Sequence, residues 1–233
     1  MTFMRVHGMH RLLALACIAG STTGVVTAAE AQSVTGNAYA VYVNTPLAGQ
    51  TQSPQAVLPA VWEPNGDMAS TTADALSVPN AMSSDFLNSM TSGAIGSADA
   101  GAQSVASVAH VNILGGLITA KEVVANSTSS RSGSGAASNA NGSTFGDLMV
   151  AGVPVTSGDA LVAPNTRMNL PNVGYVVLNE QKVTGDGAMS SGVTVNMIHV
   201  VLQQPVVGLL GEITGYRQVG EIIVGSATSA VGS

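Results

Sequence analysis

The chain has 233 residues and a formal net charge of −6 at pH 7, and only 9% of its residues are charged. Lys and Arg do not cluster anywhere, which argues against nucleic acid or an anionic lipid surface as a partner. The single cysteine, Cys17, lies near the N-terminus, so the sequence beyond it offers no disulfide and no thiolate metal site. Ser, Thr, Asn and Gly must then cover the surface, a composition that suits strands and turns.

The first 31 residues have the pattern of a Sec signal peptide. Arg5 and Arg11 form a basic start, and the apolar run "LLALACIAG" follows. This run is about half of the roughly 20 residues that a membrane helix needs. The tripeptide "AEA" at 29–31 has the small-x-small pattern of a cleavage site. We therefore expect an exported protein without a transmembrane segment in its mature part. Its expected location is extracellular, at the cell surface or in the periplasm.

Alternation of apolar and polar residues predicts β-strands along residues 32–233. In "TGNAYAVYVNTP" the pattern places Tyr39, Val41 and Val43 on one face. In "QSVASVAHVNIL" it places Val105 and Val111 on a common face. The segments "GLITAKEVVANS", "VGYVVLNEQKV", "GVTVNMIHVVLQQ", "VVGLLGEITG" and "GEIIVGSATSAV" continue the pattern.

Turn residues such as Pro, Asn, Gly and Asp separate these runs at intervals of about ten residues. This spacing predicts an all-β, single-domain, antiparallel β-sandwich-like fold over residues 32–233. The alternative is a β-solenoid, because "ALSVPNAMSSDFLNSM" and "HVNILGGLITAKEVVAN" echo each other about 35 residues apart.

Two segments depart from the strand pattern. The stretch "SSDFLNSM" has Met82, Phe86 and Met90 spaced four apart, which predicts one short helix. The tract at 127–144 is rich in Ser, Gly, Ala and Asn and contains no apolar anchor until its end. We interpret this tract as a flexible, exposed loop between strands.

The Gly115-Gly116 pair in "HVNILGGLITAKE" raises the question of a phosphate-binding loop. Such a loop needs glycines that lead into a helix N-terminus, where free N–H groups meet the anion. Here the glycines lead into a β-branched, strand-like segment, and the sequence has no "GK[ST]". The pair therefore predicts a bend between two strands.

Two histidines, His110 and His199, remain beyond the signal peptide, and both lie in predicted strands. With a carboxylate such as Glu122 or Glu180 they would complete a two-His, one-carboxylate metal site. The more common role of such residues is at a sheet surface or in a hydrogen bond near the core. We therefore predict no metal and no other cofactor, and keep both histidines as weak metal candidates.

Catalysis has no positive support in the sequence. Paired carboxylates for glycoside hydrolysis need two acids about 5–10 Å apart, and the candidates by elimination are Glu122, Glu180, Glu212 and Glu221. Carbohydrate sites also use aromatic rings, and the weak stacking candidates are Trp62 and Tyr175. A single Trp beside Pro and Leu more often anchors the hydrophobic core. No nucleophile elbow of the G-x-S-x-G type is present.

Several stretches carry a family resemblance, among them "GNAYAVYVNTPL", "SVASVAHVNILGGLITAKEVVANSTSS" and "PNTRMNLPNVGYVVLNEQ". In these segments and their order the chain resembles the exported bacterial domains of the choice-of-anchor P family. The resemblance implies an extracellular domain found in proteins that differ in their C-terminal surface anchors, and it supplies no catalytic residues.

Together these patterns predict a non-enzymatic structural or interaction protein that is secreted or held at the cell surface. Low charge and few Lys residues on strand edges favour pairing between copies, so the expected partners are further copies of this chain or other surface and matrix components. The competing class is a carbohydrate-binding or hydrolytic extracellular protein.

Overall fold

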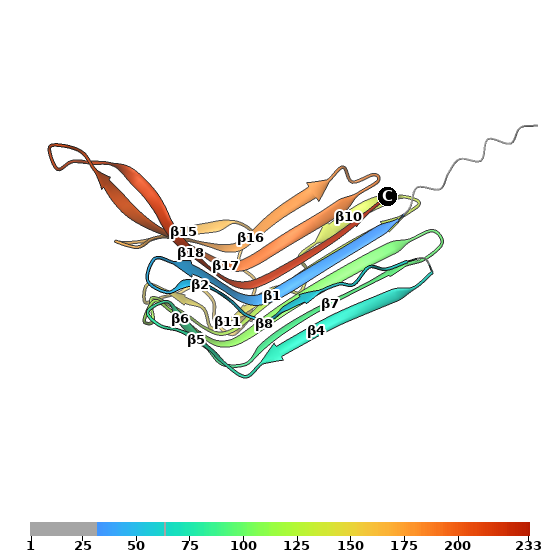
Figure 1. The fold of residues 1–233 in the computed structure, drawn as a ribbon, viewed down its shortest axis with the longest axis horizontal. Helices are drawn as coiled ribbons and strands as arrows, with labels where there is room; N and C mark the ends of the chain where they lie inside the picture. The colour runs from blue at the N-terminus through green and yellow to red at the C-terminus, as the bar shows by residue number, and fades with distance from the viewer. Residues whose placement is uncertain (1–31, 63) are drawn as a thin grey trace, which may run out of the picture. The chain divides into compact units, whose positions relative to one another are not determined.

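The structure is a computed structural model that describes residues 32–62 and 64–233. These residues form strands and turns, with no helix among them, and the part from residue 32 onward is one compact unit (Figure 1). The described part of the chain therefore has no helix long and apolar enough to cross a membrane. The expected signal peptide at 1–31 lies outside the described residues.

The first sheet has seven strands among the described residues, in the order β15-β16-β17-β18-β1-β2, and β3 also pairs with β1. The C-terminal strand β18 lies between β17 and β1 in the middle of this sheet. The strands are β1 (Ser33–Thr45), β2 (Gly49–Gln52), β3 (Gln55–Val57), β15 (Thr166–Leu170), β16 (Gly174–Gly185), β17 (Ser191–Val207) and β18 (Ile213–Gly232).

The second sheet has eleven strands within the described ranges, and β8 and β9 lie at its centre. Strands β7, β6 and then β4 and β5 continue from β8, whereas β10, β11 and β12 pair with β9. The bounds are β4 (Gly66–Ala73), β5 (Leu76–Val78), β6 (Met82–Ser84), β7 (Leu87–Ile95), β8 (Ala100–Ile113), β9 (Ile118–Ser132), β10 (Gly135–Asn139), β11 (Thr144–Gly146), β12 (Met149–Val150), β13 (Val153–Pro154) and β14 (Asp159–Ala160).

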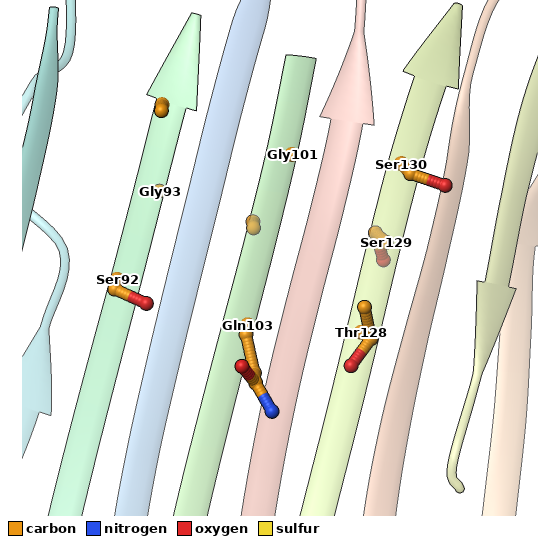
Figure 2. A pocket seen from close by; sticks show the side chains of 9 residues that line it. Ser92, Gly93, Gly101, Gln103, Thr128, Ser129 and Ser130 are labelled. Carbon is orange, nitrogen blue, oxygen red and sulfur yellow. The ribbon is translucent and has the colours of Figure 1, made fainter.

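The two sheets stack face to face as a sandwich. Neighbouring strands are antiparallel in both sheets, and backbone Cα atoms of β18 lie within 8 Å of those of β8 and β9 in the other sheet. The strand axes of the two sheets are nearly aligned. Figure 2 shows this where β1, β18 and β17 lie behind β7, β8 and β9. The predicted antiparallel sandwich is confirmed, and the β-solenoid alternative is wrong because solenoids of this kind stack parallel strands.

Apolar side chains fill most of the space between the sheets. We call this set the apolar cluster. Its largest fully buried members are Phe145, Leu87, Ile113, Ile118, Leu148, Leu170, Leu178, Met197, Ile198 and Ile222. These residues come from both sheets, so their burial joins the two layers.

Hydroxyl groups fill the space between the sheets nearer to the C-terminal end of β18. We call the set Thr91, Ser104, Ser129, Ser138, Ser191 and Ser229 the hydroxyl layer. Ser129 Oγ and Ser229 Oγ share a hydrogen bond of 2.8 Å between the sheets. Ser104 Oγ donates to the Thr228 carbonyl oxygen at 2.7 Å, also between the sheets. Beyond this layer a second, smaller apolar group closes the sandwich.

A line of irregular positions crosses both sheets and divides each long strand into two straight parts. In the first sheet one residue in each long strand has no paired partner, although the pairs on either side of it keep the same register. These residues are Ala40, Asn179, Met197 and Gly225. In the second sheet they are His110 and Lys121. His110, Asn179 and Gly225 have positive φ angles of 49°, 50° and 67°. Figure 1 shows the strands bending together midway along their length.

The bend changes which residues face inward, and this overturns part of the strand analysis. Ala40 and Val41 are both buried although they are adjacent, so Tyr39 and Val43 lie on opposite faces. Likewise Val111 is buried, whereas Val105 points outward. Strict alternation therefore predicts the strands correctly but assigns the wrong face on one side of the bend.

The structure also decides three further expectations from the sequence. The short helix predicted around Phe86 is wrong, because Met82–Ser84 and Leu87–Ile95 are strands β6 and β7. The loop predicted at 127–144 is also wrong, because most of this tract lies in β9 and β10. Two of its serines, Ser129 and Ser138, belong to the hydroxyl layer. The Gly115-Gly116 bend is confirmed, with φ angles of 68° and 93° in the turn between β8 and β9.

Candidate functional site

Histidine 199 is the centre of a polar group on the outer face of the first sheet. His199 Nδ1 lies 3.0 Å from Glu180 Oε2, and His199 Nε2 lies 3.2 Å from Glu221 Oε2. The three residues come from the adjacent strands β17, β16 and β18. They are partly buried, with 17% of the His199 side chain exposed, 32% of Glu180 and 28% of Glu221. We call this group the His199 cluster.

Both ring nitrogens of His199 face a carboxylate oxygen, and both can donate only when the ring is protonated. The hydrogen bond with Glu180 accordingly raises the pKa of His199. The same hydrogen bond lowers the pKa of Glu180, which also accepts from Asn196 Nδ2 at 2.7 Å. The two carboxylates therefore favour the protonated form of His199, and one imidazolium between two carboxylates leaves one negative charge uncompensated.

Neighbouring residues extend the cluster across the sheet. Asn196 Oδ1 accepts a hydrogen bond from Ser226 Oγ at 2.8 Å. Tyr39 pairs with Ser226 in register, and burial raises the pKa of the Tyr39 hydroxyl. The Tyr39 and Tyr42 rings lie 6.5 Å apart in an edge-to-face arrangement. This row fixes the orientation of Glu180 and His199 from one side.

The two histidines named by the sequence are not brought together. His110 lies in β8 of the other sheet, where its Nδ1 is 3.0 Å from Asp85 Oδ2 and both side chains are about two-thirds exposed. In the part of the chain that the structure describes, no group of three His, Cys, Asp or Glu residues is arranged to hold a metal ion. In the His199 cluster the two carboxylates contact opposite ends of the imidazole ring rather than one common point.

The stacking candidates also lie apart. Trp62 is 75% exposed in the connection between β3 and β4, so the expectation that it anchors the core is wrong. Tyr175 lies in β16, and the Arg167 guanidinium carbon is 3.7 Å from the centre of its ring. Arg167 therefore covers one face of Tyr175 in a cation–π contact.

The four carboxylate candidates divide into one pair and two separate residues. Glu180 and Glu221 are joined through His199. Glu122 lies in β9 of the other sheet, opposite Ala109 in register. Glu212 lies in the turn between β17 and β18. No sequence pattern could identify the pair, since the residues are 41 positions apart and meet only through strand register.

The hollow shown in Figure 2 is lined by small, uncharged residues. Ser92, Gln103 and Thr128 lie side by side across β7, β8 and β9, because these residues pair with each other in register. The hollow has a volume of ≈ 360 Å³, and neither an acid nor a histidine lines it. It offers hydrogen-bonding groups but no group able to transfer a proton near neutral pH.

The most exposed apolar residues lie on a hairpin formed by the end of β17 and the start of β18. Gln203 pairs with Gln218 and Val207 with Ile213, whereas the neighbouring strands stop pairing at Leu202 and near Gly220. We call residues 203–218 the arm, and Figure 1 shows it projecting beyond the other strands. Its exposed apolar residues are Val206 (45%), Val207 (59%), Leu209 (105%), Leu210 (94%), Ile213 (59%) and Tyr216 (64%).

The tip of the arm is an ordered turn. Gly208 N donates to the Glu212 carbonyl oxygen at 2.8 Å, and Leu210 N donates to Glu212 Oε2 at 3.1 Å. Gly211 supplies a positive φ of 86°. The turn therefore holds Leu209 and Leu210 outward. The apolar run in "VVGLLGEITG" predicts a strand, but its two adjacent leucines lie in the turn, where polar residues are usual.

Fold and site together define an all-β sandwich with an apolar arm and a cluster of one histidine between two carboxylates. No family model, no curated protein and no solved structure matches this chain. The resemblance to the choice-of-anchor P family therefore stays a prediction.

Proposed function

We propose that this protein is a non-enzymatic structural protein of the cell surface or extracellular space and that its copies associate through the arm. The observation that carries the proposal is the exposure of Leu209 and Leu210, 105% and 94%, at an ordered turn. Soluble monomers rarely present a contiguous apolar feature of this kind without a partner for it.

The apolar side chains of the arm supply part of the free energy that association needs. Full burial of one leucine side chain contributes about 1.5–3 kcal/mol. Burial of Leu209 and Leu210 alone would therefore contribute roughly 3–6 kcal/mol before the cost of association. Val207 and Ile213, each 59% exposed, flank the tip and enlarge the apolar surface.

The arrangement of the polar groups also favours a structural role. Both ring nitrogens of His199 are occupied by carboxylates, so this imidazole has no free nitrogen poised towards a substrate. The hollow of Figure 2 contains no acid. The competing class, a carbohydrate-binding or hydrolytic protein, would need Trp62 or Tyr175 beside paired carboxylates, and the contacts of these residues give it less support.

Sedimentation velocity at several protein concentrations tests the proposal. We expect the weight-average mass of the purified protein to rise with concentration. The double variant Leu209→Ser/Leu210→Ser should remain monomeric over the same range. Leu47→Ser is the matched control, because Leu47 is 85% exposed in a different turn, between β1 and β2. A protein that is monomeric at every concentration contradicts the proposal, as does equal loss in the control.

A further inference from the structure

A groove lies at the opposite end of the sandwich from the arm. Ile95 and Ala100, which line it, belong to the small apolar group that includes Val231 near the C-terminal end of β18. The arm is at the N-terminal end of the same strand. The groove has a volume of ≈ 680 Å³, which is within the range of about 300–1,000 Å³ that holds drug-sized ligands. It is therefore large enough for a few side chains.

Arg131 gives the groove an unpaired positive charge. The residue lines the groove at the end of β9, and its Nε atom is buried without a hydrogen-bond partner. None of the ion pairs among the described residues includes Arg131. Asp99 also lines the groove, on the turn between β7 and β8, and is its one acidic residue. A buried N–H group without an acceptor is costly, so an acceptor that a partner brings to the Arg131 Nε would be stabilising.

The tip of the arm has the complementary chemistry. Leu209 and Leu210 are apolar and exposed, and the carboxylate of Glu212 lies directly beside them. A carboxylate has several acceptor sites, so Glu212 can accept from Leu210 N and from a guanidinium group together. On the groove side, Ile95 and Ala100 supply an apolar wall next to Arg131.

On the basis of the proposed self-association, we infer that the arm tip of one copy binds in the groove of a second copy. Leu209 and Leu210 then pack against the wall that contains Ile95, and Glu212 pairs with Arg131. One copy cannot fill its own groove, because the 20 residues of β18 separate the two features by roughly 60 Å of strand. The contact joins two different surfaces, so it repeats head to tail from copy to copy and builds a chain of copies that is not limited to a dimer.

Charge exchange between arm and groove tests this geometry. Glu212→Arg and Arg131→Glu should each weaken association by about 30-fold or more, the effect of removing one partner of a buried charge pair. Mixing the two variants should restore assembly, because each reversed arm then meets a reversed groove and each unchanged arm an unchanged groove. Lys182→Glu, an equal charge change on the exposed part of β16, should leave association as it was.

The outcomes separate this inference from the proposed function. If Leu209→Ser/Leu210→Ser abolishes association but Arg131→Glu does not, the arm mediates self-association and the groove is not its site. If both single variants are monomeric, fold normally by circular dichroism, and stay monomeric when mixed, the inference is wrong. Co-sedimentation of the monomeric protein with phosphatidylcholine vesicles, lost in Leu209→Ser/Leu210→Ser, would make the occupant a lipid surface and also overturn it.

Discussion

The apolar cluster and the hydroxyl layer lie between the same two sheets and hold them together by different means. In the apolar cluster, side chains as large as Phe145 and Met197 are fully buried. In the hydroxyl layer, a side chain as small as that of Ser104 spans the distance from β8 to the backbone of β18. One sandwich thus combines hydrophobic burial in one region with hydrogen bonds between sheets in the other.

This difference explains why the chain contains so many small residues. Stacked sheets usually lie about 10 Å apart. Where serine side chains bond directly to the opposite backbone, the sheets must lie closer, and only small residues fit between them. Gly36 faces this layer, and a Cβ atom there would overlap Thr91 Oγ1. The abundance of Ser, Gly and Ala is therefore a packing requirement as well as a surface property.

The largest loss of stability should follow from a change in the apolar cluster. Phe145→Ala should lower the free energy of unfolding by about 3–5 kcal/mol, because it leaves a cavity in a fully buried site. Urea denaturation at neutral pH measures this change. Phe86→Ala is the control, since Phe86 is 50% exposed and its loss should cost far less. Equal losses in the two variants would show that the apolar cluster does not carry the stability assigned to it.

A smaller loss is expected in the hydroxyl layer, and from the opposite change in size. Ser129→Val should cost about 2–4 kcal/mol, because it adds volume between close sheets and removes the hydrogen bonds that Ser129 makes with Ser138 and Ser229. Ser129→Ala should cost roughly 1–3 kcal/mol through the lost hydrogen bonds alone.

Ser130→Val on the same strand is the control for this prediction, because Ser130 is exposed and its replacement should change stability by no more than about 0.5 kcal/mol. If Ser129→Val were stabilising, the hydroxyl layer would be an ordinary hydrophobic interface with room to spare.

The smallest expected effect is the pH dependence of stability that comes from the His199 cluster on the outer face of the first sheet. The raised pKa of His199 gives a stabilisation that is complete below its ordinary value of 6.5 and is lost as pH rises through the raised pKa. The lowered pKa of Glu180 gives a stabilisation that is present above its ordinary value of 4.5 and is lost as pH falls through the lowered pKa. Stability from this pair should therefore be greatest between about pH 4.5 and 6.5.

Urea denaturation between pH 5 and pH 9 measures the upper part of this profile. We expect stability to decrease towards alkaline pH by about 1 kcal/mol, since the groups are partly exposed. His199→Gln should flatten the profile. Glu221 and Tyr39 also face the cluster, so Tyr39→Phe serves as the control and should keep the slope. A wild-type profile as flat as that of His199→Gln would refute the assignment.

The sequence predicts the fold class well, because apolar alternation and regular turn residues reflect local physics. It fails where tertiary context decides. The tract that contains Ser129 has the composition of a disordered loop, yet its hydroxyl groups find partners in the opposite sheet. The bend at Gly225 reverses the inward face in each strand, and no single strand reveals that its neighbours bend at the same position.

The functional features were predictable only in part. His199 and Glu180 stand out as rare ionisable residues in strands, but their contact depends on the register of β16 and β17. The arm has two adjacent leucines in its turn, but an apolar run of this kind is equally typical of a buried strand, so the sequence alone does not distinguish the two.

The position of β18 has a consequence for how the chain acquires its fold. This strand follows all the others in chain order, yet it forms the middle of its sheet, and Gly232 pairs with Ser33. Such distant pairing makes folding slow, because a long loop must close before its contacts form. The first sheet therefore has no complete centre until β18 has joined β17 and β1, so a nascent chain that still lacks β18 cannot form this sheet.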